Sequence, residues 1–449
     1  MLKIVEAIKA AGGYCLIVGG AVRDKIMGIE GKDVDVEVYQ LEADALKQLL
    51  GTFGNVIEAG KSFGVLKLRY EGVDYDFSLP RRENKVGRGH KGFQVEMDST
   101  MTPTEAAARR DFSMNSVFMD PLTEMIFDPY SGIADIESLT LRHTSDAFSE
   151  DPLRVLRGMQ FAGRFNMTVN YVTAEICQAM RREVSDLPKE RIWEEWRKWA
   201  AKSVVPSTGI KFLVDTHWIY HYPEIWEMSG CKQEAEWHPE GDAFVHTLLC
   251  VDAAADIAIR DNLSEDDRCV LLLATLCHDM GKTTTTEFVD GRIRSRGHEQ
   301  AGEIPTLSFL DKIGCPQKIK DQVVALVVNH LAHLNCQTEK AVRRLAMKMA
   351  PSNIDMLLRL IEADHNGRPP LPKGLPDSAI AMREIADVVG VKMAMPKRIV
   401  QGRDLMTLGV TPGPAMGLVL SKLFDAQLDG AFTDLEDGLI FYKNNFTGE

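Results

Sequence analysis

Closely spaced cysteines and long hydrophobic runs are both missing from this sequence. The eight cysteines are dispersed through 449 residues without a Cys-x-x-Cys pair, so we expect reduced thiols and neither a disulfide framework nor a thiolate zinc site. No stretch approaches the roughly 20 apolar residues that a membrane-spanning helix needs. Residues 1–11 form a charged amphipathic segment without the apolar core of a signal peptide. These absences predict a cytoplasmic protein with no membrane partner.

An excess of basic residues is missing as well. Lys and Arg number 52 against 65 Asp and Glu, a net charge of −13 at pH 7, which argues against a protein that coats nucleic acid indiscriminately. A local basic surface can still bind RNA phosphates in an acidic chain. Two clusters qualify. One comprises Arg81, Arg82, Lys85, Arg88 and Lys91, and the other comprises Arg181, Arg182, Lys189, Arg191, Arg197 and Lys198, interleaved with Trp193, Trp196 and Trp199. For the tryptophans, packing in a helix core is favoured over base stacking.

Hydrophobic periodicity divides the chain at about residue 142. Before this point, alternating patterns predict strands at Tyr14–Val18, 34–38, Val65–Tyr70, 73–77 and 116–119. After it, helical spacing predominates, as at 150–164, 189–200, 243–259, 268–277 and 354–362. The length suits about three domains. The pattern predicts an α+β head followed by an all-α body.

A predicted strand, a tight turn and a helix start follow one another near the N-terminus. Gly19-Gly20 separates the strand at Tyr14–Val18 from a helix expected at 21–27. Glycines let backbone N–H groups approach an anion, the helix N-terminus adds partial positive charge, and Arg23 lies in the first turn. The combination predicts a phosphate-binding turn.

Two aspartates follow this turn on an alternating segment. Asp33 and Asp35 are two residues apart on a predicted strand, so their side chains share one face. Two hard carboxylates can hold Mg²⁺ ions that bridge a triphosphate and an attacking hydroxyl, which suggests nucleotidyl transfer. Asp76, on another alternating segment, is the candidate for a third catalytic acid. Either signal alone favours an ordinary turn or strand edge, but their joint order and spacing favour the functional interpretation.

Another pair of charges opens the helix expected at 150–164. Asp151 and Arg154 are three residues apart, which places them side by side on one helical face. The carboxylate can accept the exocyclic amino group that cytosine and adenine share, and the guanidinium can donate to the adjacent ring nitrogen. Uracil and guanine would present an acceptor to the carboxylate, so the pair would select C and A. The alternative is a surface salt bridge worth under about 1 kcal/mol.

Further motifs accompany these residues. The set comprises Gly19-Gly20-Ala21-Val22-Arg23-Asp24, Lys32-Asp33-Val34-Asp35, Arg109-Arg110-Asp111-Phe112-Ser113-Met114-Asn115-Ser116, Asp128-Pro129-Tyr130-Ser131-Gly132, Glu150-Asp151-Pro152-Leu153-Arg154-Val155-Leu156-Arg157 and Gly402-Arg403-Asp404-Leu405. In order and style it resembles the bacterial-type (class II) tRNA nucleotidyltransferases, the CCA-adding enzymes of the nucleotidyltransferase/poly(A) polymerase family. The resemblance covers the first 200 residues and resumes near the C-terminus.

This resemblance implies both roles and organisation. Asp33 and Asp35 would hold catalytic Mg²⁺, and the residues that contact the nucleotide or template its base would be Gly20, Arg23, Arg110, Asp111, Asp151, Arg154 and Arg157. The implied partners are tRNA, CTP and ATP, and not DNA. The implied domains are a nucleotidyltransferase head with a mixed or antiparallel sheet (1–142), then an elongated helical body with a nucleotide-recognition neck (143–222), an HD domain (223–368) and a tRNA-binding tail (369–449).

Histidines and acids after residue 240 form a second chemical set. Each lies on or beside a predicted helix, and imidazoles with carboxylates suit a divalent metal. The set resembles an HD phosphohydrolase domain, which some CCA-adding enzymes carry. We expect His246, His278, Asp279 and Asp364 to bind Ni, Mn, Co, Fe or Mg, with His298 and His330 as ligands of a second ion. The metal would activate water against a phosphomonoester or a 2′,3′-cyclic phosphate. A degenerate helical domain is the alternative.

The leading hypothesis is therefore a CCA-adding enzyme with a second, phosphohydrolase activity. A CC-only adding enzyme and a poly(A) polymerase are the enzymatic alternatives, and a non-catalytic RNA-binding protein is the alternative from another class. Intact Asp33, Asp35, Arg110, Asp151 and Arg154 argue against the last. The sequence leaves open whether the terminal A is added, which metal the HD domain binds, and whether the protein is a monomer or a homodimer.

Overall fold

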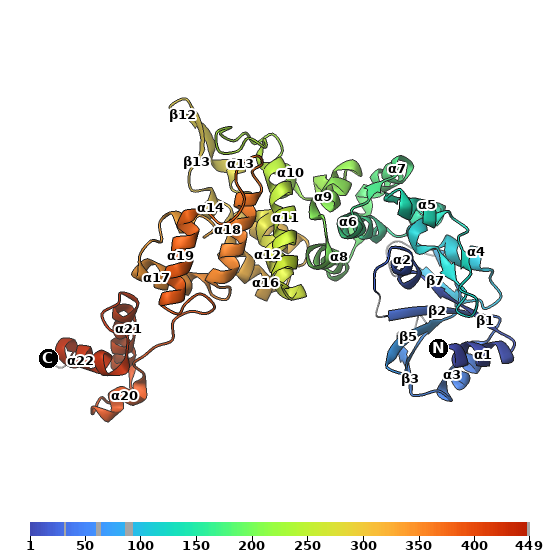
Figure 1. The fold of residues 1–449 in the computed structure, drawn as a ribbon, viewed down its shortest axis with the longest axis horizontal. Coiled ribbons are helices and arrows are strands. Elements are labelled where there is room, and N and C mark those ends of the chain that lie inside the picture. The colour runs from blue at the N-terminus through green and yellow to red at the C-terminus, as the bar shows by residue number, and fades with distance from the viewer. Residues whose placement is uncertain (31–32, 60–63, 86–92, 447–449) are drawn as a thin grey trace. The chain divides into compact units, whose positions relative to one another are not determined.

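The computed structural model describes residues 1–30, 33–59, 64–85 and 93–446, and Figure 1 labels its helices and strands. The chain forms two compact units. The first comprises Met1–Trp199 and Thr208–Ile219, and the second comprises Ala200–Ser207 and Tyr220–Glu449. The large sheet belongs to the first unit, whereas the second is mainly helical.

A seven-stranded sheet forms the centre of the first unit. Its strand order is β3 (Val56–Ala59), β4 (Val65–Tyr70), β5 (Val73–Ser78), β2 (Asp33–Tyr39), β1 (Tyr14–Val18), β8 (Phe118–Met119) and β9 (Ile126–Phe127). Among these described strands, β2 and β5 are parallel and the other neighbours are antiparallel. The α+β head with a mixed sheet is confirmed, and the strands predicted at Tyr14–Val18 and Val65–Tyr70 form at those residues.

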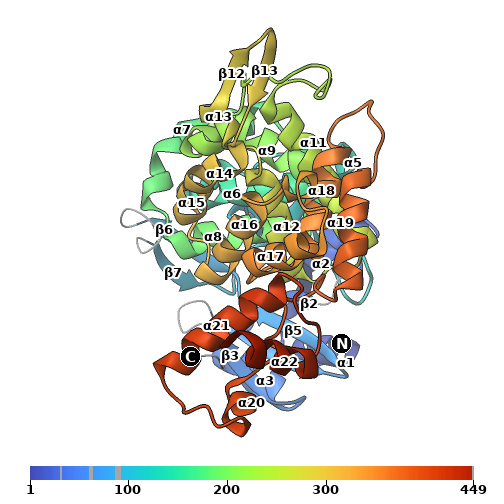
Figure 2. The same cartoon turned by 90° about the vertical axis from the view of Figure 1, so that its left-hand side faces the viewer.

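The register of β2 and β5 positions the acidic residues. Asp35 pairs with Asp76, and Asp33 pairs with Asp74. The alternate residues of β2, Val36 and Val38, are fully buried. They pack in one apolar cluster with side chains of α1 (Leu2–Ala10) and α3 (Ala43–Gly51), which lie beside the sheet in Figures 1 and 2. This apolar face fixes the register, because a shift of one residue would turn the valines to the acidic face.

Short helices and strands complete the segment up to residue 215. They are α2 (Gly20–Ile26), β6 (Arg81–Lys85), β7 (Phe93–Met97), α4 (Pro103–Ala108), α5 (Gly132–Glu137), β10 (Thr140–Leu141), α6 (Leu153–Phe165), β11 (Thr168–Val169), α7 (Tyr171–Met180), α8 (Lys189–Lys202) and α9 (Pro206–Asp215). Trp196 and Trp199 are fully buried, which confirms helix-core packing for these two tryptophans. Arg88 and Lys91 of the first basic cluster lie outside the described residues.

The helix predicted to begin at Glu150 begins at Leu153 instead. Asp146–Glu150 is a 3-10 turn, and Asp151 is extended, with φ −124° and ψ 105°. Its Oδ1 accepts a hydrogen bond from the Leu153 N–H at 3.0 Å. Aspartate favours such capping over a place inside a helix, because its short side chain can satisfy a free N–H group. Asp151 therefore precedes the helix and does not share a helical face with Arg154.

The second unit is built from helices packed around a buried centre. They are α10 (Pro223–Trp226), α11 (Ala243–Arg260), α12 (Glu265–Cys277), α13 (Lys282–Thr285), α14 (His298–Ala301), α15 (Glu303–Lys312), α16 (Gln317–Val327), α17 (Glu339–Met349), α18 (Ile354–Asn366), α19 (Asp377–Val388), α20 (Gly402–Thr407), α21 (Pro414–Leu428) and α22 (Leu435–Phe446). Helix α12 packs against α11, α16 and α18, and the last three helices share an apolar cluster of their own. No helix in the described residues combines the length and apolarity needed to span a membrane.

One hairpin departs from the predicted all-α body. Strands β12 (Thr286–Val289) and β13 (Arg292–Ser295) pair antiparallel around Asp290-Gly291 and project from the helices in Figure 2. Both turn residues have positive φ, 52° and 75°, as a two-residue type I′ turn requires. Asp-Gly supplies that conformation at low cost, and helical periodicity on either side of the hairpin concealed the signal.

Replacing Gly158 with Ala should destabilise the first unit. Gly158 lies within α6, where a methyl group would overlap the Phe212 ring and lie 2.9 Å from Phe112. Such overpacking costs about 1–3 kcal/mol, so the urea midpoint followed by tryptophan fluorescence should fall. Gly51→Ala is the matched control, because a methyl group at that helical position meets no described atom within 4 Å. Equal midpoints for the two variants would contradict the packing described here.

Candidate functional sites

A polar cleft in the first unit gathers the residues expected to bind the nucleotide. Its volume is about 490 Å³. Asp35 lines it together with all the expected nucleotide-binding residues, which are Gly20, Arg23, Arg110, Asp111, Asp151, Arg154 and Arg157. These positions span more than a hundred residues of sequence, yet the fold brings them to one surface. The cleft also includes Asn115, Phe161, Arg191 and Lys198, which were not among the expected nucleotide-binding residues.

An acidic edge adjoins this cleft. Asp35 is exposed, and Asp76 on β5 lies beside it; for Asp33 only the backbone position is described. The Asp76 carboxylate accepts a hydrogen bond from Lys67 Nζ at 2.8 Å. Gly19 adopts φ +67°, and a Cβ there would lie 3.1 Å from the Arg110 guanidinium and 3.7 Å from Asp35 Oδ2. Glycine thus lets the turn approach both groups, and the carboxylate oxygens suit a hard cation such as Mg²⁺.

Buried acids hold the arginines of the cleft in place. Arg23 is 4% exposed and donates to Asp24 at 2.6 Å and to Asn115 Oδ1 at 2.6 Å. Burial lowers the pKa of Arg23, an effect that the adjacent Asp24 opposes. Glu37, on the same strand face as Asp35, is 1% exposed and accepts hydrogen bonds from Arg109 at 3.2 Å and Arg110 at 3.5 Å. The alternation of β2 was the signal in the sequence that could have revealed Glu37.

Asp111 is bonded to the protein on both oxygens. It accepts from Arg157 at 2.7 Å, from Asn115 at 2.9 Å and from the Phe112 N–H at 2.7 Å. Burial by itself raises the pKa of Asp111, but Arg157 and the hydrogen bonds from Asn115 and Phe112 outweigh it and lower the pKa to about 2. Asp111 therefore fixes the Arg157 guanidinium, which reaches the cleft.

Asp151 and Arg154 both line the cleft but do not pair with each other in the way the sequence suggested. Asp151 Oδ2 accepts from Arg191 at 3.2 Å. Arg154 is 9% exposed and donates to the carbonyl oxygens of Ala147 and Arg109, both at 2.6 Å. Each side chain is thus held by its own set of partners. Arg191, which was predicted only as part of a basic cluster, is a further member of the group.

The Asp111–Arg157 pair should make stability depend on acidic pH. The folded pKa of Asp111, about 2, lies below the unfolded value of about 3.9. The ionised carboxylate therefore contributes stability above about pH 4, on the order of 2 kcal/mol, which is lost as the pH falls toward 2. Asp111→Asn should lower the urea midpoint at pH 7, and its deficit relative to the unmodified protein should shrink between pH 4 and 2. The exposed Asp186→Asn variant is the control, and a deficit independent of pH would contradict the pairing.

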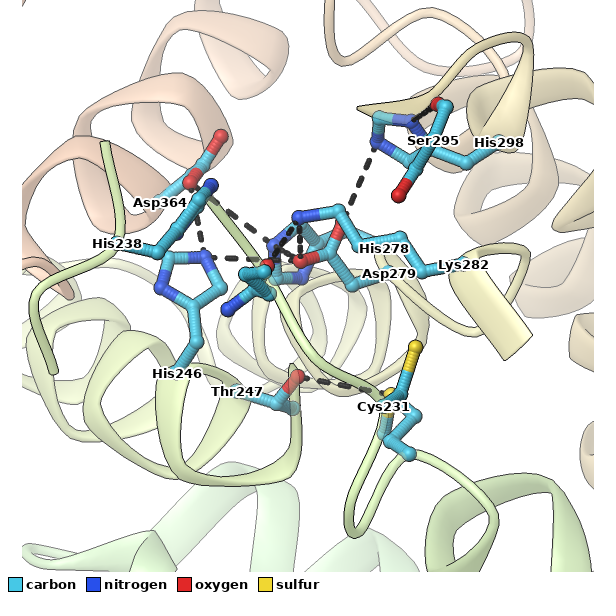
Figure 3. A network of polar contacts seen from close by, with 12 residues as sticks. Cys231, His238, His246, Thr247, His278, Asp279, Lys282, Ser295, His298 and Asp364 are labelled. Carbon is cyan, nitrogen blue, oxygen red and sulfur yellow. Dashed lines mark hydrogen bonds and ion pairs between the residues drawn. The ribbon is translucent and has the colours of Figure 1, made fainter. Parts of the chain in front are cut away.

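A histidine cluster lies at the centre of the second unit (Figure 3). We use this name for His246, His278, Asp279, His298, His330 and Asp364, which were all predicted. Their ligand atoms form two groups whose members lie within 4.8 Å of one another, one with His246, His278 and Asp364, the other with Asp279, His298 and His330. Asp279 lies between them, with Oδ2 3.4 Å from His278 and Oδ1 3.3 Å from His298. These residues come from five separate stretches of sequence, namely α11, the residues after α12, α14, the turn after α16, and α18.

The hydrogen bonds of the histidines leave one ring nitrogen of each facing the cluster. The Nδ1 atoms of His278, His298 and His330 each lie 2.7 Å from a backbone carbonyl three residues earlier. His246 Nδ1 lies 2.7 Å from Glu240 Oε1. An acceptor at Nδ1 holds the proton there and leaves Nε2 as a lone pair for a metal.

The inward-facing nitrogens provide a test of the metal hypothesis. His298 Nε2 and His330 Nε2 lie 3.2 Å apart, and His278 Nε2 is buried without a hydrogen-bond partner in the described part of the chain. Two lone pairs at that separation repel each other unless a cation or proton lies between them. The donor set, imidazole nitrogen with carboxylate oxygen, fits a divalent ion.

Neighbouring charges also shape this cluster. Burial lowers the pKa of His330 to about 3, with added contributions from His298 and His278. Burial raises the pKa of Asp279, but His278 and Lys282 outweigh it, so the pKa lies well below its usual range. Lys282 is 7% exposed, and its Nζ donates to Asp279 Oδ2 at 2.6 Å. The spacing of Asp279 and Lys282, three residues apart, was the available signal for this contact.

Two residues in contact with the cluster were not among the predicted metal ligands. Glu240 faces His246, and the Cys250 sulfur lies 3.3 Å from His246 Nε2. Cys250 belongs to the same group of candidate ligand atoms as His246, His278 and Asp364. It follows His246 by four residues on one helix, a spacing that places both on one face. The sequence analysis considered only closely spaced cysteine pairs as thiolate metal sites. It therefore did not predict a site in which a cysteine is combined with a histidine.

Known proteins match both units. Residues 15–142 match the poly A polymerase head domain, and residues 243–367 match the HD domain. A multifunctional CCA protein of Xanthomonas oryzae pv. oryzae is 34% identical over 428 residues, which cover 92% of this chain and 98% of that protein.

Solved structures share the fold. The Bacillus stearothermophilus CCA-adding enzyme in complex with CTP has a TM-score of 0.66 at 18% identity and covers 99% of this chain and 97% of its own. The Thermotoga maritima CCA-adding enzyme complexed with tRNA-CCA has a TM-score of 0.59 at 16% identity, with 98% and 94% covered. By its sequence identity over nine-tenths of its length, the chain belongs to the multifunctional CCA protein family.

Proposed function

We propose that this protein adds and repairs the 3′-terminal CCA of tRNA without a nucleic-acid template, using CTP and ATP. The observation that carries the proposal is the placement of Asp35, with Asp76 registered beside it, at the cleft that holds Arg110, Asp151 and Arg154. The carboxylates suited to binding a metal therefore lie at the same surface as the side chains suited to recognising a base. The CCA-adding activity named in the relatives supports the same assignment.

In this proposal the aspartates and the arginines have separate roles in nucleotidyl transfer. Asp33, Asp35 and Asp76 would hold Mg²⁺, which supplies charge neutralisation for the triphosphate and activates the attacking hydroxyl. Arg110, fixed by Glu37, would bind the phosphates beside the Gly19-Gly20 turn. Arg23 would support this end of the cleft from its buried position against Asp24 and Asn115.

Asp151, Arg154 and Arg157 would select the base. Asp151 is held by Arg191 and Leu153, Arg154 by two carbonyls, and Arg157 by Asp111. Side chains fixed in this way present their remaining hydrogen-bonding positions in a constant geometry, which selective recognition requires. The carboxylate would accept the amino group of cytosine or adenine, while uracil and guanine would leave it facing another acceptor.

We further propose a metal-dependent phosphohydrolase activity in the histidine cluster. Ni, Mn, Co, Fe or Mg would be held by His246, His278, Asp279 and Asp364, with a second ion at His298 and His330, and would supply an activated water. A cavity of about 520 Å³ beside Asp364, lined by Trp237 and Arg368, offers room for the organic part of a phosphomonoester or cyclic phosphate. Lys282, next to Asp279, is placed to stabilise negative charge on the phosphate. The cytoplasmic location and the choice between monomer and homodimer stay predictions.

The two proposed activities should be lost separately. Asp35→Ala should reduce incorporation of labelled CTP and ATP into tRNA lacking CCA by roughly 100-fold or more, because the metal loses a ligand, and should spare phosphate-ester hydrolysis. Asp279→Ala should have the opposite effect. Asp74→Asn is the control for the acidic edge, since this exposed residue on β5 is not assigned to the metal site. Loss of both activities in either Asp35→Ala or Asp279→Ala would contradict two independent sites.

Base selection should depend on the anchored pair in the cleft. The unmodified protein should incorporate CTP and ATP but not UTP or GTP. Asp151→Asn should relax this preference, because an amide can donate to the uracil and guanine carbonyls that a carboxylate repels. Asp186→Asn, an exposed change outside the cleft, is the control. The length of the product on a short RNA acceptor distinguishes CCA addition from CC-only addition and from poly(A) synthesis. Incorporation of UTP or GTP by the unmodified protein as readily as CTP would refute base selection by side chains.

A further inference from the structure

We propose that Cys250 is a thiolate ligand of the first metal site in the histidine cluster, so that this site favours zinc or cobalt over magnesium. Cys250 would thus join His246, His278 and Asp364, while Asp279, which lies between the two metal positions, faces both. The inference rests on the proposed presence of a metal in the cluster, but it does not depend on which ester is hydrolysed.

The position of Cys250 on α11 fits a shared metal ion. His246 and Cys250 are one helical turn apart and both are fully buried. Cys250 Sγ lies 3.3 Å from His246 Nε2, and His246 Nε2 lies 3.1 Å from Asp364 Oδ1. His278 Nε2 lies 4.0 Å from the same oxygen. Ligand atoms around a tetrahedral zinc ion, with bonds of about 2.0–2.3 Å, are about 3.3–3.8 Å apart, so the four atoms need only small adjustments.

Unpaired hydrogen-bonding capacity at the site is a separate observation that points to a cation. His278 is fully buried, its Nδ1 is committed to the Thr275 carbonyl, and its Nε2 has no hydrogen-bond partner among the described residues. His246 has a carboxylate at each ring nitrogen, with Glu240 Oε1 2.7 Å from Nδ1 and Asp364 Oδ1 3.1 Å from Nε2. Buried acceptors facing one another are costly unless a cation lies between them.

Simple packing is the competing explanation for a buried cysteine. Close packing around Cys250 agrees with this explanation, because a side chain in place of Gly367, just after α18, would overlap the Cys250 sulfur. A packing thiol, however, has no need to face ligand atoms. Here the sulfur belongs to a group of four candidate ligand atoms that come from α11, α18 and the residue after α12.

The sulfur would also distinguish the two metal positions. The second group, Asp279, His298 and His330, offers only nitrogen and oxygen among its described members. Thiolate favours borderline and soft ions such as zinc, whereas magnesium prefers oxygen ligands. On binding, the sulfur–hydrogen bond of Cys250 would break, its proton would pass to solvent, and a sulfur–metal bond would form.

Cobalt(II) titration of the metal-free, full-length protein tests this directly. We expect a sulfur-to-cobalt charge-transfer absorption band in the near ultraviolet that saturates with one ion. Cys250→Ser should abolish the band and weaken zinc binding by at least about 10-fold to 100-fold in competition with a chelator, while magnesium binding stays unchanged. Cys315→Ser, which changes a buried cysteine of the same unit outside the cluster, should retain the band. Circular dichroism and CTP incorporation verify that each variant is folded.

The outcomes separate this inference from the proposed function. A cobalt complex without the sulfur band, or a band that persists in Cys250→Ser, overturns the role of Cys250 but leaves the metal centre intact. A Cys250→Ala variant that lowers the melting temperature without changing zinc affinity supports packing and also overturns it. Failure of the metal-free protein to bind either ion would remove the metal centre itself, and with it the proposed hydrolysis.

Discussion

Glu37 is almost fully buried between Arg109, Arg110 and the Tyr39 hydroxyl. A carboxylate in that position is stable only because opposite charge and hydrogen bonds replace its lost water. The same constraint recurs at Asp111 with Arg157, and at Asp279 with Lys282. In each case one buried acid fixes the position of a cation next to a cavity. The attraction between the two charges offsets the free energy that is lost when they leave water. The sheet of the first unit and the helices of the second unit position these ion pairs beside the cavities.

The two sites use different frameworks for this purpose. In the first unit, the parallel pairing of β2 and β5 aligns acids that are about forty residues apart in sequence, while the apolar face of the sheet prevents a register shift. In the second unit, helices converge and backbone carbonyls orient the imidazoles. These carbonyls lie three residues earlier, on α12, at the end of β13 and at the end of α16, so each of these histidines gains its tautomer from its own local structure.

Much of this arrangement was predictable where the physical signal is local. The strands at Tyr14–Val18 and Val65–Tyr70 were found because alternation marks a half-buried strand, and α11 and α18 because their periodicity is strong. The start of α6 was misplaced, since a capping aspartate and a first-turn aspartate look the same without backbone angles. The β12–β13 hairpin was missed because a two-residue turn is a short signal within a helical context.

The sequence by itself determined the residue types, their order, and the faces on which neighbours along one element lie, because these follow from the periods of strand and helix. It thereby determined the α+β head and the helical body, and it identified candidate members of both charged sets, although not Glu37, Glu240 or Cys250. Tertiary structure decided which partners the charges have. It paired Asp151 with Arg191, Asp111 with Arg157, and Asp364 with His246. Those pairings join residues across packed elements, and no period within one element encodes the distance between two of them.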